Sequence, residues 1–301
     1  MTKRIGLVIN PTSGKGRGAS IGAEVASRLQ AEGHEVIDLS GETAEVSRER
    51  AVAGIAAGLD VLAVTGGDGM ANLGVNLCAG TSTVLAIVPA GTGNDIARAL
   101  DLPVHDPSAS ARVIASGRVR TIDAGRHTDT DGVSRWFAGV LGAGFDSVVN
   151  ERANTWAWPR GRMRYNLAIA RELPVFKPIP YVIEVDGVSQ RTEAMLVAVA
   201  NGPSYGGGMM VCPDASFDDG MFDVLVVHQI STIEFLKVFP KVFSGKHLGH
   251  PAVEILRGRE VRLEAPGIVS YADGERFVSL PMSCENVPGA LKVLVCGPEV
   301  A

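Results

Sequence analysis

The first part of the chain alternates short apolar runs with segments of helical spacing. The runs have the character of buried parallel strands and cover residues 4–10, 34–40, 61–65, 84–88 and 119–123. Between the first two runs, Ile21, Val25 and Leu29 recur every fourth residue, as on one face of a helix. Helical segments are also expected at residues 43–58, 70 onward, 94–100 and 109–116. This alternation predicts an α/β domain, a parallel sheet with helices on both faces.

The pattern changes after residue 125. Short strand candidates separated by turns follow at residues 134–140, 181–185, 194–200, 222–228, 260–264 and 291–295. Asp186-Gly187 is typical of a hairpin turn. Two helices, at residues 153–173 and 231–243, interrupt the strands. We therefore expect a first domain over residues 1–125 and a mainly antiparallel second domain over residues 126–301. The last segment is a candidate to return to the first domain.

Composition narrows the class of protein. The 301 residues are 46% hydrophobic and 20% charged, which is typical of a folded globular protein with a sizeable core. A net charge of −5 argues against non-specific nucleic-acid binding. The isolated cysteines form no metal motif and predict free thiols in a reducing compartment: Cys78, Cys212, Cys284 and Cys296. No stretch has the roughly 18 apolar residues of a membrane span, and the first apolar run is too short for a signal peptide, so we expect a cytoplasmic protein.

Two glycine-rich turns follow neighbouring strands in the first domain. The first is Gly66-Gly67-Asp68-Gly69, and the second covers residues 89–95 and ends in Asp95. Glycines let a ligand approach the backbone, and amides at the start of a helix can receive phosphate. A carboxylate in such an anion site indicates Mg²⁺ bound with a nucleotide. Either turn alone could be an ordinary loop, but together they predict one crevice at the carboxyl ends of the strands.

Other nucleotide-binding patterns are missing. The loop at residues 11–16 lacks Walker A spacing, and no G-x-G-x-x-G sits correctly for a dinucleotide site. Instead, several short motifs occur in order between Arg4 and Val295: Asn10-Pro11-Thr12-Ser13-Gly14, Gly66-Gly67-Asp68-Gly69, Gly91-Thr92-Gly93-Asn94-Asp95, Asn201-Gly202 with Tyr205-Gly206-Gly207-Gly208-Met209, Asp219-Gly220, and Asp273-Gly274-Glu275. This series resembles the diacylglycerol kinase catalytic family, and most of all its soluble bacterial lipid kinases, which are related to sphingosine and ceramide kinases.

The resemblance implies a fold and an activity. The fold is an ATP-binding α/β domain like that of NAD kinase and phosphofructokinase, followed by a β-sandwich domain for the lipid, with the site between them. The implied reaction transfers the γ-phosphoryl group of ATP to a lipid hydroxyl, with diacylglycerol as the first expectation. Sphingoid bases, ceramide and phosphatidylglycerol are alternative acceptors.

Two other functions stay open. A kinase of a small soluble alcohol is one alternative, because Gly-Gly-Asp-Gly also occurs in the related folds. A catalytically silent lipid-binding module is another, since Met70 replaces the usual threonine of the family. Gly139 also departs from the family, whose members often have asparagine there, and both changes bear on nucleotide affinity and rate. The presence of Asp68, Asp95 and Glu275 argues against the silent module.

By this resemblance, the nucleotide contacts are Asn10, Thr43, Gly66, Gly67, Asp68, Gly69, Met70, Ala71, Asn72 and Thr92. Asp68, Asp95 and Asp123 each follow or end a strand, and we expect them to converge on Mg²⁺, partly through waters. For Asp123, helix capping is an equal alternative. Glu275 matches the general base that accepts the proton of the lipid hydroxyl. On the residues alone, the favoured interpretation is a hairpin turn at Asp273-Gly274 with Glu275 solvated.

An acidic turn at residues 216–221 carries a second metal hypothesis. By resemblance, Asp219 and backbone carbonyls of Ser216 and Met221 bind a structural ion, Mg²⁺ or Ca²⁺. The alternative is an Asp-Gly hairpin without an ion.

A soluble enzyme with a bilayer-resident substrate needs a membrane contact, and residues 155–165 are the candidate. Trp156 and Trp158 suit the headgroup boundary, and Arg160, Arg162 and Arg164 suit anionic lipid. Alternatively, the tryptophans pack in the core of the second domain. We expect peripheral association with the inner face of the membrane, ATP and lipid as ligands, no nucleic acid, and possible homodimers.

Overall fold

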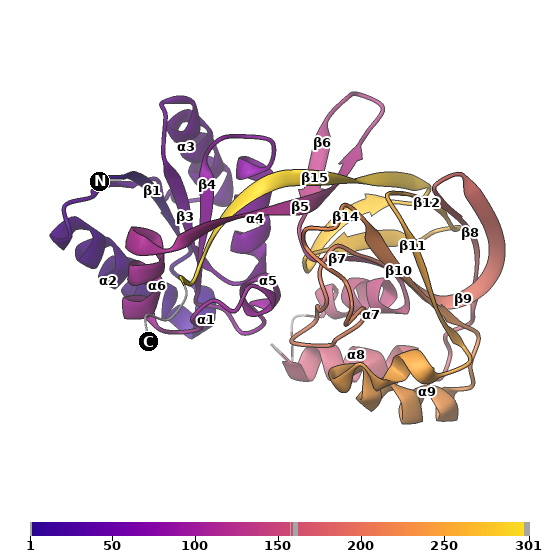
Figure 1. The fold of residues 1–301 in the computed structure, drawn as a ribbon. Coiled ribbons are helices and arrows are strands. Elements are labelled where there is room, and N and C mark those ends of the chain that lie inside the picture. The colour runs from indigo at the N-terminus through magenta and orange to yellow at the C-terminus, as the bar shows by residue number, and fades with distance from the viewer. Residues whose placement is uncertain (1, 157, 159–161, 298–301) are drawn as a thin grey trace.

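The computed structural model describes residues 2–156, 158 and 162–297, and it has two domains (Figure 1). The first domain contains a parallel sheet and its covering helices: β1 (Arg4–Ile9), α1 (Ser13–Gly16), α2 (Gly18–Ala31), β2 (Glu35–Asp38), α3 (Ala44–Ala56), β3 (Val61–Gly66), α4 (Asp68–Cys78), β4 (Val84–Pro89), α5 (Asp95–Ala99) and α6 (Pro107–Ser116). The strand order is β4-β3-β1-β2, and every neighbouring pair is parallel.

Helices cover both faces of this sheet, as the alternation predicts. On one face, Val25 and Leu29 of α2 and Ile114 of α6 pack with Ile5 of β1 in one core cluster. On the other face, α3 and α4 pack against the opposite side chains of the same strands, in a cluster that includes Val75. Thr43 caps α3, because its Oγ1 accepts a hydrogen bond of 3.3 Å from the Val46 amide.

The second domain is a mostly antiparallel β-sandwich with helices on its outside: β6 (Ser134–Phe137), β7 (Val140–Gly144), α7 (Phe145–Asn154), α8 (Arg162–Glu172), β8 (Ile179–Val185), β9 (Val188–Ala200), β10 (Phe222–His228), α9 (Thr232–Val238), η1 (Phe239–Ser244), η2 (Lys246–Gly249), β11 (Val253–Gly258), β12 (Glu260–Glu264), β13 (Val269–Ala272) and β14 (Glu275–Ser279). Its main core contains Phe137, Ile183 and Phe222. The Asp186-Gly187 turn joins β8 to β9 as a hairpin.

Two long strands connect the domains (Figure 1). β5 (Arg118–Thr128) and β15 (Met282–Val295) pair antiparallel over most of their length. β15 begins beside β12 in the second domain and ends in the first, where Val293 pairs parallel with Leu85 of β4. The last described strand thus extends the first sheet, and the predicted division at residue 125 falls inside β5.

Four predicted elements differ from the structure. The run at residues 119–123, predicted as a parallel strand, belongs to β5, which pairs antiparallel with β15. The single helix predicted at residues 153–173 is two helices, α7 and α8. The helix predicted at residues 231–243 is α only to Val238 and then a 3₁₀ helix, since the ring of Pro240 removes an amide that an α-helix would use. The strand predicted at residues 134–140 is divided between β6 and β7, because Ala138 and Gly139 leave the ladder to donate their amides to Asp273.

Candidate active site

A cleft of about 730 Å³ lies between the domains. Its walls come from α3, α4 and the β1–α2 connection of the first domain, and from β6 and β14 of the second. The lining residues are Asn10, Ser13, Ala44, Arg48, Gly67, Gly69, Met70, Asn72, Leu73, Asn76, Val133, Ser134, Arg135, Glu275, Arg276 and Phe277. Glu275 and the glycines of the first turn, far apart in sequence, therefore face the same space.

The carboxylate of Asp68 joins the two glycine-rich turns. Its Oδ2 accepts a hydrogen bond of 3.0 Å from the Asn94 amide, and its Oδ1 accepts one of 2.6 Å from the Asp95 amide. The turns also touch through their backbones, since a Cβ on Gly91 would lie 2.4 Å from the Cα of Gly67. Only glycine allows this approach. The two motifs are thus in direct contact at the carboxyl ends of β3 and β4.

Glu275 reaches this structure from the second domain. A Cβ built on Gly69 would lie 2.5 Å from Glu275 Oε1, so the carboxylate occupies the space beside the first turn of α4. The pKa of Glu275 is raised, mainly because neighbouring atoms desolvate the carboxylate and also because Asp68 carries like charge. A carboxylate with a raised pKa holds a proton more readily, which suits a base.

Asp273 fixes the turn that carries Glu275. Its carboxylate accepts hydrogen bonds of 2.9 Å from the Ala138 amide and 2.8 Å from the Gly139 amide, and it also bonds the Asn72 side chain. Burial raises the pKa of Asp273 to about 6. A Cβ on Gly139 would lie 2.8 Å from Asp273 Oδ1, so glycine at this position gives the carboxylate room. Asp273 is a positioning residue that the sequence marked only as part of a turn.

Asp95 connects the domains on the other side of the site. Its Oδ1 accepts hydrogen bonds of 2.8 Å from the Gly207 amide and 3.1 Å from the Gly208 amide. Burial raises the pKa of Asp95, and the nearby Asp68 raises it further. The glycine-rich motif at residues 205–209 therefore binds a carboxylate of the first domain.

Asp123 does not join this group. Its Oδ2 accepts a hydrogen bond of 2.7 Å from the Gly220 amide, and its Oδ1 accepts one of 2.8 Å from the Gly289 amide. It is buried and anchors the acidic turn of the second domain to β15. The expected convergence of three aspartates is therefore not observed. In residues 2–156, 158 and 162–297, no three His, Cys, Asp or Glu side chains are grouped to hold a metal ion.

Asp68 and Asp95 nevertheless suit Mg²⁺ beside a nucleotide. Mg²⁺ keeps several waters and usually takes one or two carboxylates together with substrate phosphates. A Cβ built on Gly93 would lie 2.4 Å from Asp68 Oδ2 and 3.7 Å from Asp95 Oδ2, so the two carboxylates lie near each other, and a cation would relieve their repulsion. These two residues fit the donor set of a catalytic ion that phosphate completes.

The acidic turn does not fit its expected structural ion. Asp219 Oδ1 accepts a hydrogen bond of 3.0 Å from the Met221 amide, and Asp219 Oδ2 pairs with the guanidinium of Arg257. The carbonyl of Met221 accepts a hydrogen bond of 3.1 Å from the Asn286 side chain. The Ser216 hydroxyl donates to Asp218. Asp219 thus already has an arginine as its counter-ion.

The expected nucleotide residues divide into two groups. Asn10, Gly67, Gly69, Met70 and Asn72 line the cleft. The others do not appear on its wall: Gly66, Asp68, Ala71, Thr43 and Thr92. Of these, Ala71 is buried in the core and Thr43 caps α3, with the next residue, Ala44, on the cleft wall.

Three cationic wall residues were missed by sequence reasoning: Arg48, Arg135 and Arg276. They lie in a helix and two strands outside any motif, so no sequence signal could have found them. Their guanidinium groups suit phosphate.

A second, apolar cavity lies inside the second domain. It has a volume of about 80 Å³ and is lined by side chains of β9, β10, α7, α8, α9 and η1, among them Phe145, Ile169, Leu196, Phe235 and Phe239. One buried acid borders it: Asp146, whose Oδ2 accepts a hydrogen bond of 3.2 Å from the Tyr205 hydroxyl. Burial raises the pKa of Asp146 to about 6.

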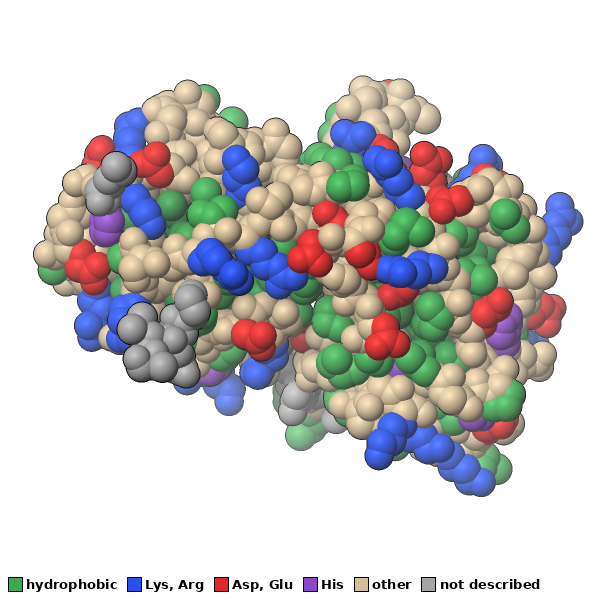
Figure 2. Space-filling view, in the orientation of Figure 1, with side chains coloured by type: hydrophobic (Ala, Val, Ile, Leu, Met, Phe, Trp, Pro, Cys, Tyr) green, Lys and Arg blue, Asp and Glu red, His purple; other side chains and the backbone are tan. Residues whose placement is uncertain are grey.

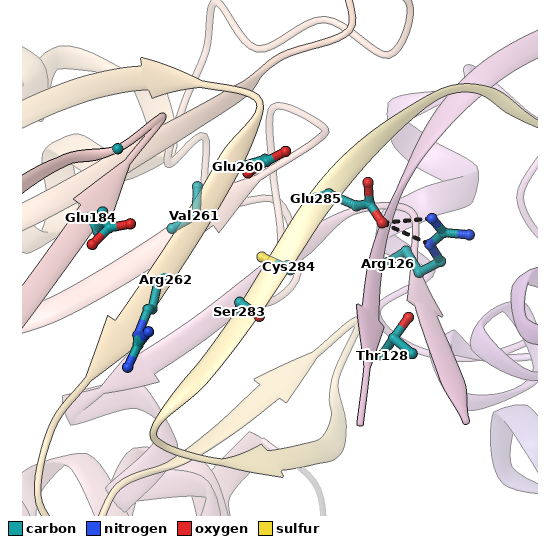
Figure 3. Close-up of a pocket in the computed structure, with 10 residues that line it drawn as sticks. Arg126, Thr128, Glu184, Glu260, Val261, Arg262, Ser283, Cys284 and Glu285 are labelled. Atoms are coloured by element: carbon teal, nitrogen blue, oxygen red, sulfur yellow. Dashed lines mark hydrogen bonds and ion pairs between the residues drawn. The ribbon is translucent and has the colours of Figure 1, made fainter. Parts of the chain in front are cut away.

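Figure 3 shows a third depression, a groove of about 330 Å³ on the outer surface of β5, β12 and β15. Arg126 and Glu285 form an ion pair of 2.6 Å in it, and Arg262 and Glu184 face the same space. None of the expected site residues lines this groove. We assign it no role in the reaction.

The membrane-contact hypothesis falls partly outside the described residues, which omit Arg160. Trp156 is partly buried against the core formed by α7 and α8, whereas Trp158 is 80% exposed. Arg162 and Arg164 lie in α8. In the described part of the chain, no helix has the length and apolar character needed to cross a bilayer.

Known proteins resemble both domains. Residues 4–127 match the model of the diacylglycerol kinase catalytic domain, and residues 139–295 match the YegS C-terminal NAD kinase beta sandwich-like domain. The chain is 39% identical over 292 residues to a diacylglycerol kinase of Mycobacterium tuberculosis (strain ATCC 25618 / H37Rv), covering 97% of this chain and 94% of that protein. It is 28% identical over 293 residues to one of Bacillus subtilis (strain 168), covering 95% and 94%.

Solved structures show the same fold. A putative diacylglycerol kinase from Bacillus anthracis str. Sterne has a TM-score of 0.80 at 24% identity, covering 99% of both chains. An NAD kinase from Archaeoglobus fulgidus, solved in complex with ATP, has a TM-score of 0.52 at 13% identity, covering 97% of this chain and 93% of that one.

Proposed function

Because this chain belongs to the diacylglycerol kinase family and is an ATP-dependent lipid kinase, we propose that it phosphorylates diacylglycerol to phosphatidic acid in the cleft between its domains. The observation that carries this proposal is the position of Glu275, whose carboxylate lies beside Gly69 at the start of α4. A candidate base from one domain thus faces a candidate phosphate site of the other.

The chemistry needs a cradle for the ATP phosphates. The N-terminus of α4 offers backbone amides and the positive end of the helix dipole. Arg48 and Arg135 add positive charge to the cleft wall, whereas the guanidinium of Arg276 pairs with Glu151 at 3.1 Å. Asp68 and Asp95 would hold Mg²⁺, which when bound neutralises charge that develops on the phosphates.

Glu275 takes the proton of the acceptor. As the lipid oxygen forms a bond to the γ-phosphorus, the bond from that phosphorus to the bridging oxygen of ADP breaks. The hydroxyl proton moves to a Glu275 carboxylate oxygen, and ADP leaves with the bonding electron pair. Asp273 holds the turn of Glu275 through the Ala138 and Gly139 amides, so the base is positioned before substrate arrives.

The similarity of the chain to diacylglycerol kinases favours a lipid acceptor over a small soluble alcohol, and the apolar cavity is a candidate site for an acyl chain. Its lining is apolar apart from a few groups such as Asp146, Tyr205 and His247. Its free volume of about 80 Å³ is under three times the ~30 Å³ share of one water in the liquid. An acyl chain would therefore have to part the helices that cover it. Peripheral association with the inner face of the membrane follows from a bilayer-resident acceptor.

Incubation with γ-labelled ATP and Mg²⁺ tests the function. Acceptors would be supplied separately as detergent dispersions: diacylglycerol, phosphatidylglycerol, ceramide, a sphingoid base, and glycerol as the soluble alcohol. We expect labelled phosphatidic acid, and no product from a Glu275→Gln preparation. Label in another lipid would correct the acceptor, and label in glycerol alone would favour the soluble-alcohol kinase. ATP binding with no labelled product would support the silent module.

A further inference from the structure

The roof of the apolar cavity consists of α8, α9 and η1. Ile169 of α8, Phe235 and Val238 of α9, and Phe239 and Val242 of η1 all line it. Phe235 also packs on Phe145 of α7, with ring centroids 5.5 Å apart. Since these helices lie on the outside of the sandwich, one side of the roof faces the cavity and the other faces solvent (Figure 1).

The solvent side of the roof is unusually apolar. Ile233 is 69% exposed, Leu236 57% and Phe243 52%. On the neighbouring α8, Met163 and Leu167 are also exposed. Single exposed apolar residues are common, but several on adjacent helices mark a contact surface. We call the set Ile233, Leu236, Lys237, Lys241 and Phe243 the α9–η1 face.

The charges of this face are mainly positive. Lys237 and Lys241 are exposed, and Lys246 of η2 follows a few residues later. The acid of α9, Glu234, bonds the imidazole of His250 at 3.1 Å. Figure 2 shows basic side chains gathered along the lower edge of the second domain, where Figure 1 places α9. Since the chain as a whole has a net charge of −5, the positive charge of this face is local.

We propose that the α9–η1 face docks on an anionic lipid bilayer, so that the cavity roof lies against the membrane that holds the substrate. Ile233, Leu236 and Phe243 would enter the headgroup boundary, while Lys237 and Lys241 attract the anionic surface. A second copy of the chain is a poorer occupant, because a two-fold interface would place these lysines against themselves. The inference rests on the proposed lipid acceptor and adds the surface through which that acceptor is reached.

Vesicle sedimentation with the full chain tests the surface. The vesicles are phosphatidylcholine alone or phosphatidylcholine with phosphatidylglycerol, at low and high salt. The variants are Ile233→Ser/Leu236→Ser and, separately, Lys237→Gln/Lys241→Gln. Matched controls are Val188→Ser, an exposed apolar residue in the β8–β9 hairpin, and Lys292→Gln on β15. Melting curves establish that each variant is folded. The lysine variant keeps the test decisive if the serine variant does not fold.

We expect wild type and both controls to bind the anionic vesicles, more weakly at high salt. The lysine variant should bind about thirtyfold more weakly, given the usual contribution of each surface cation. The serine variant should lose binding to the anionic vesicles. Equal binding by wild type and the two α9–η1 variants would overturn the inference. The inference would also be overturned if the wild-type protein bound no vesicles.

A kinase assay with short-chain diacylglycerol, dispersed without a bilayer, separates the two proposals. We expect the α9–η1 variants to retain this activity while losing activity on vesicles. If the wild type phosphorylates the dispersed substrate but binds no vesicles, the docking surface is rejected and the proposed lipid kinase function stands. Normal vesicle binding with no phosphorylation of any lipid would reject the proposed function and leave the docking surface.

Discussion

Glu275 Oε1 lies over Gly69, so close that a Cβ on the glycine would be 2.5 Å from it. These residues come from different domains and are separated by most of the chain. Gly69 lies in the first turn of α4, whose N-terminus faces the cleft, and Glu275 begins β14. The catalytic proposal depends on this approach, because it places a base within reach of an acceptor at the phosphate site.

Glu275→Gln keeps the shape of the side chain but removes the basic carboxylate. We expect turnover to fall by roughly two to four orders of magnitude, with ATP affinity nearly unchanged. Initial rates and nucleotide titration would measure this, with Glu193→Gln on β9 as the matched control. Near-normal turnover would show that Glu275 is not the base.

Gly69→Ala tests the close approach itself. A methyl group there would displace the Glu275 carboxylate, so we expect turnover to fall by at least about tenfold, since small misplacements of reacting groups are costly. Gly249→Ala is the control, because a Cβ at Gly249 meets no atom within 4 Å. Comparable rates for both variants would mean that Glu275 has no fixed position in the reaction.

The raised pKa of Glu275 predicts the pH dependence of activity. The base must be ionised, so kcat/KM should fall as pH drops through a pKa above the ordinary value of about 4.3. Asp68→Asn removes a negative charge that contributes to the shift, so the acid limb of the profile should move to lower pH even as the rate falls. If the acid limb does not move, the charge of Asp68 does not influence the pKa of Glu275.

Asp95→Ala should weaken the contact between the domains. The amides of Gly207 and Gly208 lose their acceptor, at a cost of about 1–3 kcal/mol in the free energy of unfolding. Asp95→Asn keeps one acceptor oxygen and should lose less. Urea unfolding of both variants would measure the difference. Wild-type stability in Asp95→Ala would mean that these hydrogen bonds contribute nothing measurable.

The Asp219–Arg257 pair predicts that a metal ion is dispensable at the acidic turn. We expect the melting temperature of the wild type to be the same with Mg²⁺ and with chelator. In a double-mutant cycle, Asp219→Ala and Arg257→Met should couple by about 0.2–1 kcal/mol, the range of exposed ion pairs. Stabilisation by Mg²⁺ that disappears in Asp219→Ala would instead place an ion there.

The sequence by itself determined the architecture. Strand–helix alternation predicted the parallel strands at residues 4–10, 34–40, 61–65 and 84–88, because the spacing of apolar side chains is a local property of the sequence. The glycine-rich turns after β3 and β4 likewise mark the carboxyl edge of that sheet. The ordered motifs resemble one kinase family, and the similarity of both domains to known proteins confirms that resemblance.

Only the tertiary structure decided which polar groups meet. Sequence placed Asp68, Asp95 and Asp123 at strand ends alike, yet Asp123 bonds the Gly220 and Gly289 amides, whereas Asp95 bonds those of Gly207 and Gly208. A carboxylate binds whichever donors the fold brings to it, and those donors lie about 100 residues or more away. The contacts of Arg257 with Asp219 and of Glu275 with Gly69 could not be predicted for the same reason. Contacts between distant segments leave no local pattern in the sequence.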